Sequence, residues 1–216
     1  MFILNHHQSI ANQYLAELRD VTKQNDRLRF RRNLERLGEI MAYEISKEMD
    51  FQSSSIITPL EKTIVDLLSS QPVIIPILRA AIPFFQGMVN YFDQADCGFI
   101  GAYRKKPLEE NSDVEIEFGY LAAPGIKGKE VILVDPMLAT GKSFVESLNN
   151  LLKNGEPSRI HIVSVIAAPE GIQYIKDNLS VSHKFWLCAL DEKLDEKYYI
   201  LPGLGDAGDL AFGPKL

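Results

Sequence analysis

Short apolar runs alternate with amphipathic segments along most of the chain. Branched and aromatic side chains dominate five runs that predict buried strands, at 72–78, 97–105, 130–134, 159–168 and 184–190. The segments that follow three of these runs have apolar residues at helical spacing and predict helices at 79–92, 141–155 and 169–179. Strands that are apolar on both faces and alternate with helices are typical of parallel sheets. The pattern therefore predicts an α/β fold with a mostly parallel central sheet flanked by helices.

A helical region of about 9–48 precedes this alternation. Its apolar face is marked by four residues at helical spacing: Leu34, Leu37, Met41 and Ile45. Its opposite face carries five arginines: Arg27, Arg29, Arg31, Arg32 and Arg36. We interpret this basic face as solvated or facing another subunit, with ion pairs such as Arg31–Glu35, and a basic effector site is the alternative. The apolar face needs a surface to cover it, which predicts a homodimer or a larger homo-oligomer.

Two further segments differ from the strand and helix pattern. Residues 106–113 are polar and loop-like, and the alternating residues 114–124 after them predict one arm of a hairpin. The tail from Tyr198 to the end is rich in Gly and Pro, so we expect an ordered loop there and neither helix nor strand. No linker or internal repeat divides the chain, and residues 1–216 are therefore expected to form a single domain.

Composition narrows the class of protein only slightly. The chain is 46% hydrophobic and 24% charged, the ordinary balance of a globular protein, and its net charge of −6 argues against a general nucleic-acid binder. Cys97 and Cys188 lie far apart in apolar runs, so buried free thiols and a reducing cytoplasm are expected. No signal-peptide pattern and no apolar run of membrane-spanning length is present, so no membrane partner is expected.

The stretch 134–143, VDPMLATGKS, carries the clearest chemistry. It ends in Gly-Lys-Ser, like the phosphate loop of nucleotide triphosphatases, but that motif also requires a glycine five residues before Gly141. Pro136 occupies that position, and proline offers neither the N–H group nor the backbone freedom of glycine. Asp135 at the end of the strand is also foreign to that motif. The triphosphatase interpretation is therefore rejected.

A different phosphate site fits the same stretch. Residues 140–143 lie where a turn enters a helix, so backbone N–H groups, two hydroxyls and the helix dipole converge on one anion. Asp135 lies just before them, where its carboxylate suits the hydroxyls of a sugar whose phosphate the turn holds. This combination predicts a ribose 5-phosphate site, and an ordinary strand–turn–helix corner remains the alternative.

These residues carry a family resemblance. VILVDPMLATGKS resembles the 5-phosphoribosyl-1-diphosphate (PRPP) signature of the phosphoribosyltransferases. VIIPILRAA, GFIGAYR, YYILPGLGDAGD and the leading LRFRRNLERLGEIMAYEIS resemble the uracil phosphoribosyltransferase family specifically, from about residue 9 to the C-terminus. The resemblance implies a type I phosphoribosyltransferase-like fold with N-terminal helices (about 9–48), a flexible hairpin flap (about 106–123) that closes over the site, and a C-terminal base-binding hood (about 191–216).

The resemblance also implies a reaction, in which uracil and PRPP give UMP and diphosphate, and assigns its residues. PRPP binding is implied for the loop residues Asp135, Pro136, Met137, Leu138, Ala139, Thr140, Gly141, Lys142 and Ser143. Arg79 and Arg104 are implied as diphosphate contacts. The uracil contacts are implied to be Ile200, Gly205, Asp206 and Ala207, with Asp206 also touching PRPP. The implied catalytic set is Asp135, Arg79, Arg104 and Asp206. Mg²⁺ is the implied cofactor, held mainly by PRPP and water, with its protein ligands unknown.

Several positions depart from the family pattern. Lys142 and Ala81 replace the usual glycines, and Leu210, Ala211 and Pro214 replace more polar residues. We predict an ordinary φ for Lys142, with its ammonium group assisting phosphate binding. Two alternatives remain open: a pyrimidine-responsive RNA-binding regulator on the same fold, and a weakly active paralogue. GTP activation, as in some relatives, is also left open, and the four histidines are expected to be structural.

Overall fold

The computed structural model describes the backbone of residues 1–104 and 116–214, and their side chains except those of 102–104 and 116–118. Its main sheet has the strand order β1-β11-β10-β8-β4-β6-β7, and all neighbours along it are parallel except β6 and β7. The strands are β1 (Phe2–Ile3), β4 (Val73–Leu78), β6 (Phe99–Arg104), β7 (Ile116–Ala122), β8 (Glu130–Val134), β10 (Arg159–Ala167) and β11 (His183–Leu190). Short strands β5 (Asp96–Cys97) and β9 (Met137–Leu138) pair with β4 and β10. The predicted mostly parallel sheet is confirmed.

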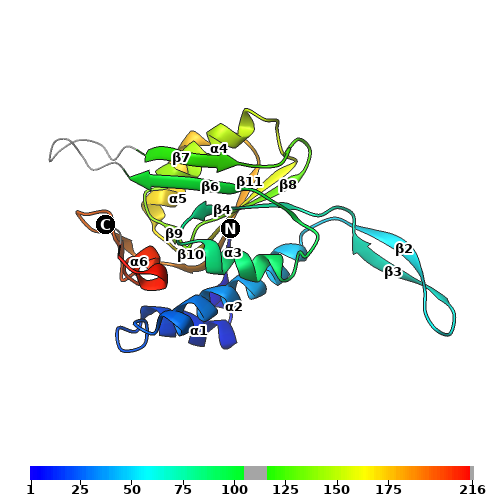
Figure 1. Cartoon of the computed structure of the whole chain (residues 1–216), viewed down its shortest axis with the longest axis horizontal. Helices are drawn as coiled ribbons and strands as arrows, with labels where there is room; N and C mark the ends of the chain where they lie inside the picture. The colour runs from blue at the N-terminus through cyan, green and yellow to red at the C-terminus, as the bar shows by residue number, and fades with distance from the viewer. Residues whose placement is uncertain (105–115, 215–216) are drawn as a thin grey trace.

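Helices cover both faces of this sheet (Figure 1). One side carries α1 (Ile10–Arg19), α2 (Arg27–Ser46) and α3 (Ile82–Val89), and the other carries α4 (Lys142–Leu152) and α5 (Pro169–Asn178). In β4, Ile74 packs in the core of the first side, whereas Val73 and Ile75 pack in the core of the second. Successive strand residues point to opposite faces, so a strand buried on both faces must be apolar throughout.

The N-terminal helices are capped by their own sequence and pack closely against the body. Ser9 and Asp26 accept backbone hydrogen bonds at the starts of α1 and α2. Gly38 in α2 and Gly87 in α3 allow the two helix backbones to touch, since a Cβ at Gly38 would lie 2.1 Å from the carbonyl oxygen of Phe84. The apolar face of α2 is thereby buried within the same chain. The expectation that this face needs a second subunit is wrong.

The tail also differs from expectation. Residues 198–214 contain strand β13 (Ile200–Leu201), which pairs with β12 (Lys193–Leu194), and helix α6 (Ala207–Phe212). Asp206 caps this helix, because its carboxylate accepts a hydrogen bond from the Asp209 backbone N–H at 2.9 Å. The prediction of a loop without helix or strand is therefore wrong: the cap and the burial of Ala207 and Ala211 outweigh the glycines.

A hairpin of β2 (Phe51–Ile57) and β3 (Lys62–Leu68) projects from the body, and the sequence pattern does not reveal it (Figure 1). Both strands are largely exposed, so they lack the buried face that makes a strand recognisable. The expected flap, 106–123, lies largely outside the described residues, and only its strand β7 is seen, paired antiparallel with β6. Within the described residues no helix has both the length and the apolar character to cross a membrane.

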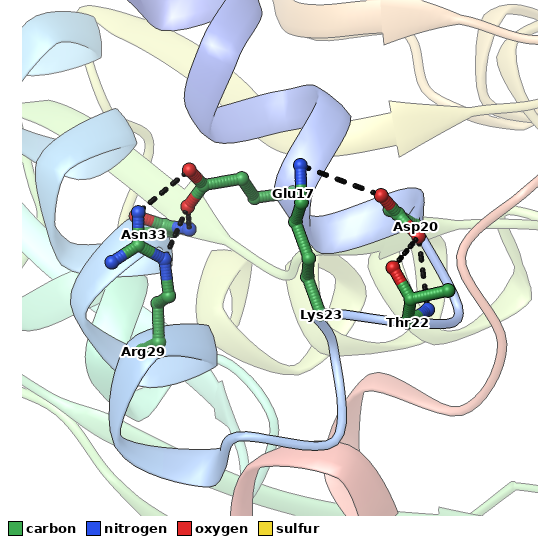
Figure 2. A network of polar contacts seen from close by, with 6 residues as sticks. All are labelled: Glu17, Asp20, Thr22, Lys23, Arg29 and Asn33. Atoms are coloured by element: carbon green, nitrogen blue, oxygen red, sulfur yellow. Dashed lines mark hydrogen bonds and ion pairs between the residues drawn. The ribbon is translucent and has the colours of Figure 1, made fainter.

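The basic face of α2 is occupied by contacts within the chain. Arg29 donates to both carboxylate oxygens of Glu17 at 2.7 Å, and Asn33 donates to the same carboxylate at 2.7 Å (Figure 2). Glu35 pairs with Arg32, whereas Arg31 donates to a backbone carbonyl in α6. The expected Arg31–Glu35 pair is therefore wrong, because Arg31 has a backbone acceptor in the C-terminal segment.

Glu17→Gln should lower the free energy of unfolding at neutral pH by about 1–3 kcal/mol, since three hydrogen bonds to a carboxylate are weakened. Hydrogen bonds from Arg29 and then Asn33 lower the pKa of Glu17 to about 2. A depressed folded-state pKa gives stability that is present above the unfolded pKa and is lost as pH falls through the folded one. Wild type should thus lose this contribution between about pH 4.5 and 2, and the variant should lack that slope.

Urea denaturation measured from pH 7 down to pH 3 tests this expectation. Glu44→Gln is a matched control, because Glu44 forms an exposed pair with Lys47 within one helix. Its effect should stay below about 0.5 kcal/mol. Equal stabilities of Glu17→Gln and wild type at neutral pH would contradict the expectation.

Candidate functional site

A pocket of about 300 Å³ lies at the carboxyl ends of β4 and β8, beside the C-terminal segment. Ligands of open α/β sheets bind at this edge, because the loops that leave parallel strands converge there. The pocket is lined by Ile77, Leu78, Arg79, Ala80, Asp135, Met137, Ala139, Thr140, Gly141, Ser143, Phe144, Tyr198, Tyr199, Ile200, Gly205, Asp206, Ala207 and Gly208. Three segments that are distant in sequence therefore meet in one cavity.

Most of the residues predicted from the sequence line this pocket. They are Arg79, Asp135, Met137, Ala139, Thr140, Gly141, Ser143, Ile200, Gly205, Asp206 and Ala207. Pro136 and Leu138 are buried beneath the loop, and Lys142 begins α4 outside the lining. Arg104 ends β6, and its side chain lies outside the described residues. The roles of these residues remain predictions.

The loop after β8 has the geometry of an anion site. Gly141 is the N-cap of α4 with φ 77°, a left-handed conformation that suits glycine. Asp135 Oδ1 accepts a hydrogen bond from the Met137 backbone N–H at 3.1 Å, and Ser164 Oγ donates to the Asp135 carbonyl at 2.6 Å. The loop is thus fixed at its start by side chains and opens onto the positive end of a helix.

The two positions that replace family glycines have ordinary backbone conformations. Ala81 has φ −71° and is fully buried at the start of α3. Among the described non-glycine residues only Tyr198 has a positive φ, so the predicted ordinary φ of Lys142 is confirmed. Neither replacement therefore strains the backbone, and the glycine that needs φ > 0 is the one that is kept, Gly141.

Gly171, the third residue of α5, supports this loop from below. A Cβ there would lie 2.1 Å from the Ala139 carbonyl oxygen and 2.5 Å from Leu138 Cδ2. Likewise, a Cβ on Gly141 would lie 2.5 Å from the Gly171 carbonyl oxygen. The loop and α5 touch through their backbones, and the sequence gives no local sign of this contact because its two sides are 30 residues apart.

Arg79 reaches the pocket from the turn after β4. Its Nη2 donates to Asp209 Oδ1 at 2.9 Å and to the Gly213 carbonyl at 2.6 Å. Its Nε is buried and has no hydrogen-bond partner among the described residues. A guanidinium group that lines a pocket suits an anionic ligand, because its planar fork can donate two parallel hydrogen bonds to phosphate or carboxylate oxygens.

Two aromatic residues that were not predicted from the sequence, Tyr198 and Tyr199, lie on another wall of the pocket. Both line the pocket, and Tyr198 has φ 63°. The Asp195 carboxylate holds their turn by accepting the backbone N–H groups of Lys197 and Tyr199, each at 2.8 Å. The sequence feature that could have identified these residues is a pair of adjacent aromatics at the start of a glycine-rich tail. Their rings supply apolar surface of the kind that a planar base requires.

The side chains that line the pocket are compatible with a metal ion that takes most of its ligands from the substrate. Within the described residues, no three His, Cys, Asp or Glu side chains come together as metal ligands. The pocket does contain two carboxylates, Asp135 and Asp206. Mg²⁺ usually keeps several waters and binds through one or two carboxylates plus substrate phosphates. Asp135 and Asp206 therefore suit Mg²⁺ better than a metal that needs an all-protein cage.

The other titratable candidates lie in the core. His161 is buried, its Nε2 lies 2.6 Å from Glu130 Oε2, and its Nδ1 accepts the indole N–H of Trp186. That geometry makes it a satisfied structural histidine, as expected. Burial raises the pKa of the Cys188 and Cys97 thiols. Cys188 is buried as expected, whereas the expectation of a buried thiol is wrong for Cys97, which is half-buried.

Comparison with known proteins agrees with this geometry. The family model described as uracil phosphoribosyltransferase matches residues 4–214. A curated uracil phosphoribosyltransferase of Porphyromonas gingivalis is 48% identical over 96% of this chain and 95% of its own length. A second, of Pyrococcus furiosus, is 44% identical over 93% of this chain and 85% of its own.

Structural comparison supports the same conclusion. The structure of the AQ2163 protein from Aquifex aeolicus is similar with a TM-score of 0.86 and 31% identity, over 97% of both chains. The sheet with its two layers of helices is the type I phosphoribosyltransferase fold. A phosphate-type loop, an arginine and the C-terminal segment thus meet in one pocket of this fold. By motif, architecture and similarity over nearly its whole length, the chain belongs to the uracil phosphoribosyltransferase family.

Proposed function

We propose that this chain transfers the 5-phosphoribosyl group of PRPP to uracil and releases UMP and diphosphate. The observation that carries the proposal is the convergence of the loop 135–143, Arg79 and the segment 200–207 on one pocket. Each wall suits one part of the reaction: the 5-phosphate, the leaving diphosphate and the base. The membership in the family supplies the substrate pair.

The loop 135–143 and Arg79 bind different charged parts of PRPP. The N–H groups of residues 140–143 receive the 5-phosphate at the start of α4, and the Asp135 carboxylate accepts the ribose hydroxyls. As the bond from the anomeric carbon to the diphosphate oxygen breaks, negative charge collects on the leaving group. Arg79, which lines the pocket, is the cation that we assign to bind that charge, and Arg104 is a further candidate. Mg²⁺ supplies additional charge neutralisation when bound.

The C-terminal segment selects the base through its backbone. Uracil offers an acceptor at O4 and a donor at N3, and cytosine reverses both. Backbone groups around Ile200 and Gly205–Ala207 cannot change their polarity, so cytosine would leave polar groups unpaired. The new bond forms between uracil N1 and the anomeric carbon, and the N1 proton leaves. Asp206, whose Oδ1 already accepts the Asp209 N–H, is the carboxylate that we assign to receive this proton.

An assay with PRPP, Mg²⁺ and radiolabelled bases tests the proposal. Uracil should be converted to UMP, while cytosine, hypoxanthine and adenine remain unconverted. The turnover number also tests the weakly active paralogue, which predicts the same product at a much lower rate. Conversion of a purine without conversion of uracil would refute the assignment.

Lys142→Gly should raise the KM for PRPP by about twofold to fivefold, because a solvent-accessible ion pair between an ammonium group and a phosphate contributes roughly 0.5–1 kcal/mol. The uracil KM should stay unchanged, since Lys142 lies on α4 and away from the base-side segment. Initial rates with each substrate varied in turn measure both constants. An unchanged or lower PRPP KM would reject the contribution of this ammonium group.

The RNA-binding alternative has lost its supporting observation. It relied on the basic face of residues 27–36, where carboxylates now pair with Arg29 and Arg32, and Arg31 and Arg36 donate to other groups of the chain. GTP activation stays a prediction that rests on the resemblance alone.

A cytoplasmic location is proposed because both cysteines are free thiols, which is usual in a reducing compartment.

A homo-oligomer is proposed on different grounds from the ones expected. The β2–β3 hairpin forms a sheet of its own and exposes six large apolar side chains: Phe51, Ile56, Ile57, Leu60, Ile64 and Leu67. A lone two-stranded hairpin is marginally stable in water, so this arm needs a covering surface. A second copy of the chain is the proposed occupant, because closed homo-oligomers are the most frequent assemblies and each copy carries the same arm.

Ile57→Asp combined with Ile64→Asp should shift the mass in solution to that of a monomer. Both side chains are more than 70% exposed in the single chain, so the change costs little folding stability. Light scattering coupled to size-exclusion chromatography measures the mass. Val21→Asp is the control, since Val21 is 72% exposed outside the arm and its replacement should leave the mass unchanged. A monomeric wild type at micromolar concentration would contradict the proposal.

A further inference from the structure

An ion pair behind the pocket holds the segment that carries the base-side residues. Arg19 ends α1 and Asp191 follows β11, and they form a bidentate contact: Nη1 lies 2.8 Å from Oδ2 and Nη2 lies 2.5 Å from Oδ1. The Asp191 side chain is 4% exposed and that of Arg19 is 23% exposed. Neither residue is among those that line the pocket.

Both partners of this pair also bind one backbone residue, Gly203. Arg19 Nη1 donates to the Gly203 carbonyl at 2.8 Å, and the Gly203 N–H donates to Asp191 Oδ2 at 2.9 Å. The donor and the acceptor of Gly203 are thus fixed by two opposite charges. Gly203 lies between Ile200 and Gly205, which both line the pocket, so the pair sets where the chain passes between two predicted uracil contacts.

Leu204, the residue after Gly203, is also held by a side chain from the N-terminal part of the chain. Gln24 Nε2 donates to the Leu204 carbonyl at 3.2 Å and to the Leu18 carbonyl at 3.0 Å. Leu204 is 3% exposed, so its side chain is packed as well. Arg19 at the end of α1 and Gln24 in the connection to α2 therefore hold two successive residues of the base-side segment through side-chain contacts.

We propose that Arg19 and Asp191 are positioning residues for base recognition, which act through Gly203 and make no contact with the substrate. The inference rests on the proposed function. Recognition by backbone groups depends on the position of the main chain, because a backbone N–H or C=O cannot adjust by changing a rotamer. A small displacement of such a group costs much of its hydrogen bond.

The loop 135–143 has different supports. It begins after β8, ends in α4 and rests on Gly171 of α5. Loss of the Arg19–Asp191 pair should therefore affect uracil far more than PRPP. A residue with only a structural role would lower stability without separating the two substrates, and this difference makes the proposal testable.

The experiment measures the KM for uracil and the KM for PRPP in Asp191→Asn, Arg19→Lys and wild type. Each substrate is varied while the other is kept at a saturating concentration. The uracil KM should rise about tenfold, the factor that corresponds to one hydrogen bond to a charged group. The PRPP KM should change less than about twofold, and the ratio of uracil to cytosine turnover should fall. A wild-type uracil KM in both variants would overturn the proposal.

Glu17→Gln is the matched control. Glu17 lies two residues before Arg19 in α1 and also pairs with an arginine, but its partners Arg29 and Asn33 belong to α2. This variant should lose stability and keep the wild-type uracil KM. An equal rise of the uracil KM in Glu17→Gln would assign the effect to general loosening of α1 and overturn the proposal.

Two further outcomes can be distinguished from these: variants that do not fold, and a wild-type chain that is inactive. If Asp191→Asn and Arg19→Lys do not fold, Gln24→Leu removes the bonds to the Leu204 and Leu18 carbonyls and leaves the ion pair in place. Its uracil KM should rise about threefold, as expected for loss of the one neutral hydrogen bond to the base-side segment. No change in that variant would then overturn the proposal. A wild-type chain that converts no uracil would refute the proposed function instead, whatever the variants do.

Discussion

Arg79→Ala should lower kcat/KM for PRPP by about 100- to 1000-fold, the usual cost of removing one preorganised group that binds the charge of a transition state. The guanidinium side chain of Arg79 lines the pocket, and its Nε is a buried donor with no partner among the described residues. Arg79→Lys should recover only part of the loss, because an ammonium group cannot present the planar fork that meets phosphate oxygens.

The same substitution should leave the fold intact. Arg79 and Asp209 form an ion pair in which the side chains are 34% and 40% exposed, and partly exposed pairs contribute roughly 1 kcal/mol or less. Loss of this pair and of the hydrogen bond to the Gly213 carbonyl should lower the unfolding temperature by only a few degrees. Arg32→Ala, which removes an arginine from an exposed pair on α2, is the activity control. A change of kcat/KM for PRPP below about threefold in Arg79→Ala would exclude Arg79 from the transition-state contacts.

Gly171→Ala should damage the same reaction from beneath the loop. The new methyl group would lie 2.1 Å from the Ala139 carbonyl oxygen and 2.5 Å from Leu138 Cδ2, so either the loop or α5 must move. Overpacking of this kind costs about 1–3 kcal/mol of stability. A displacement of the loop by about 1 Å should lower kcat/KM for PRPP roughly 100-fold.

Gly125→Ala is the matched control for this prediction. A Cβ at Gly125 meets nothing within 4 Å, and its φ is not positive. Its kinetics and unfolding temperature should match those of wild type. Kinetics with PRPP and with uracil, together with calorimetry, measure all the expected effects. A folded Gly171→Ala enzyme with wild-type PRPP kinetics would show that the loop tolerates the displacement.

The elements that the sequence predicted well are those whose pattern is local. Strands such as β8 and β10 are continuous apolar runs, and α4 and α5 show helical spacing with Pro169 at the start of α5. The loop 135–143 was also predictable, because the residue types at a strand end and a helix start define an anion site without reference to the rest of the chain.

The elements that were missed depend on partners elsewhere in the chain or outside it. Helix α6 forms in a glycine-rich tail because Asp206 caps it and because Ala207 and Ala211 are buried beside α2. The β2–β3 arm has no buried face within one chain, so its strands lack the alternation that would reveal them. The basic face of α2 is solvated as expected, but the partners of Arg29 and Arg31, Glu17 and the Ala211 carbonyl, come from other parts of the chain.

The sequence by itself determined the fold class, the family and the position of the phosphate loop, because each is carried by contiguous residues. Only the tertiary structure decided that Arg79 is held by Asp209 and Gly213, that Gly171 supports the loop, and that Arg19 and Asp191 grip Gly203. These contacts join residues 12 to 184 positions apart. A sequence lists such residues without showing that they touch, since contact follows from the packing of the whole chain.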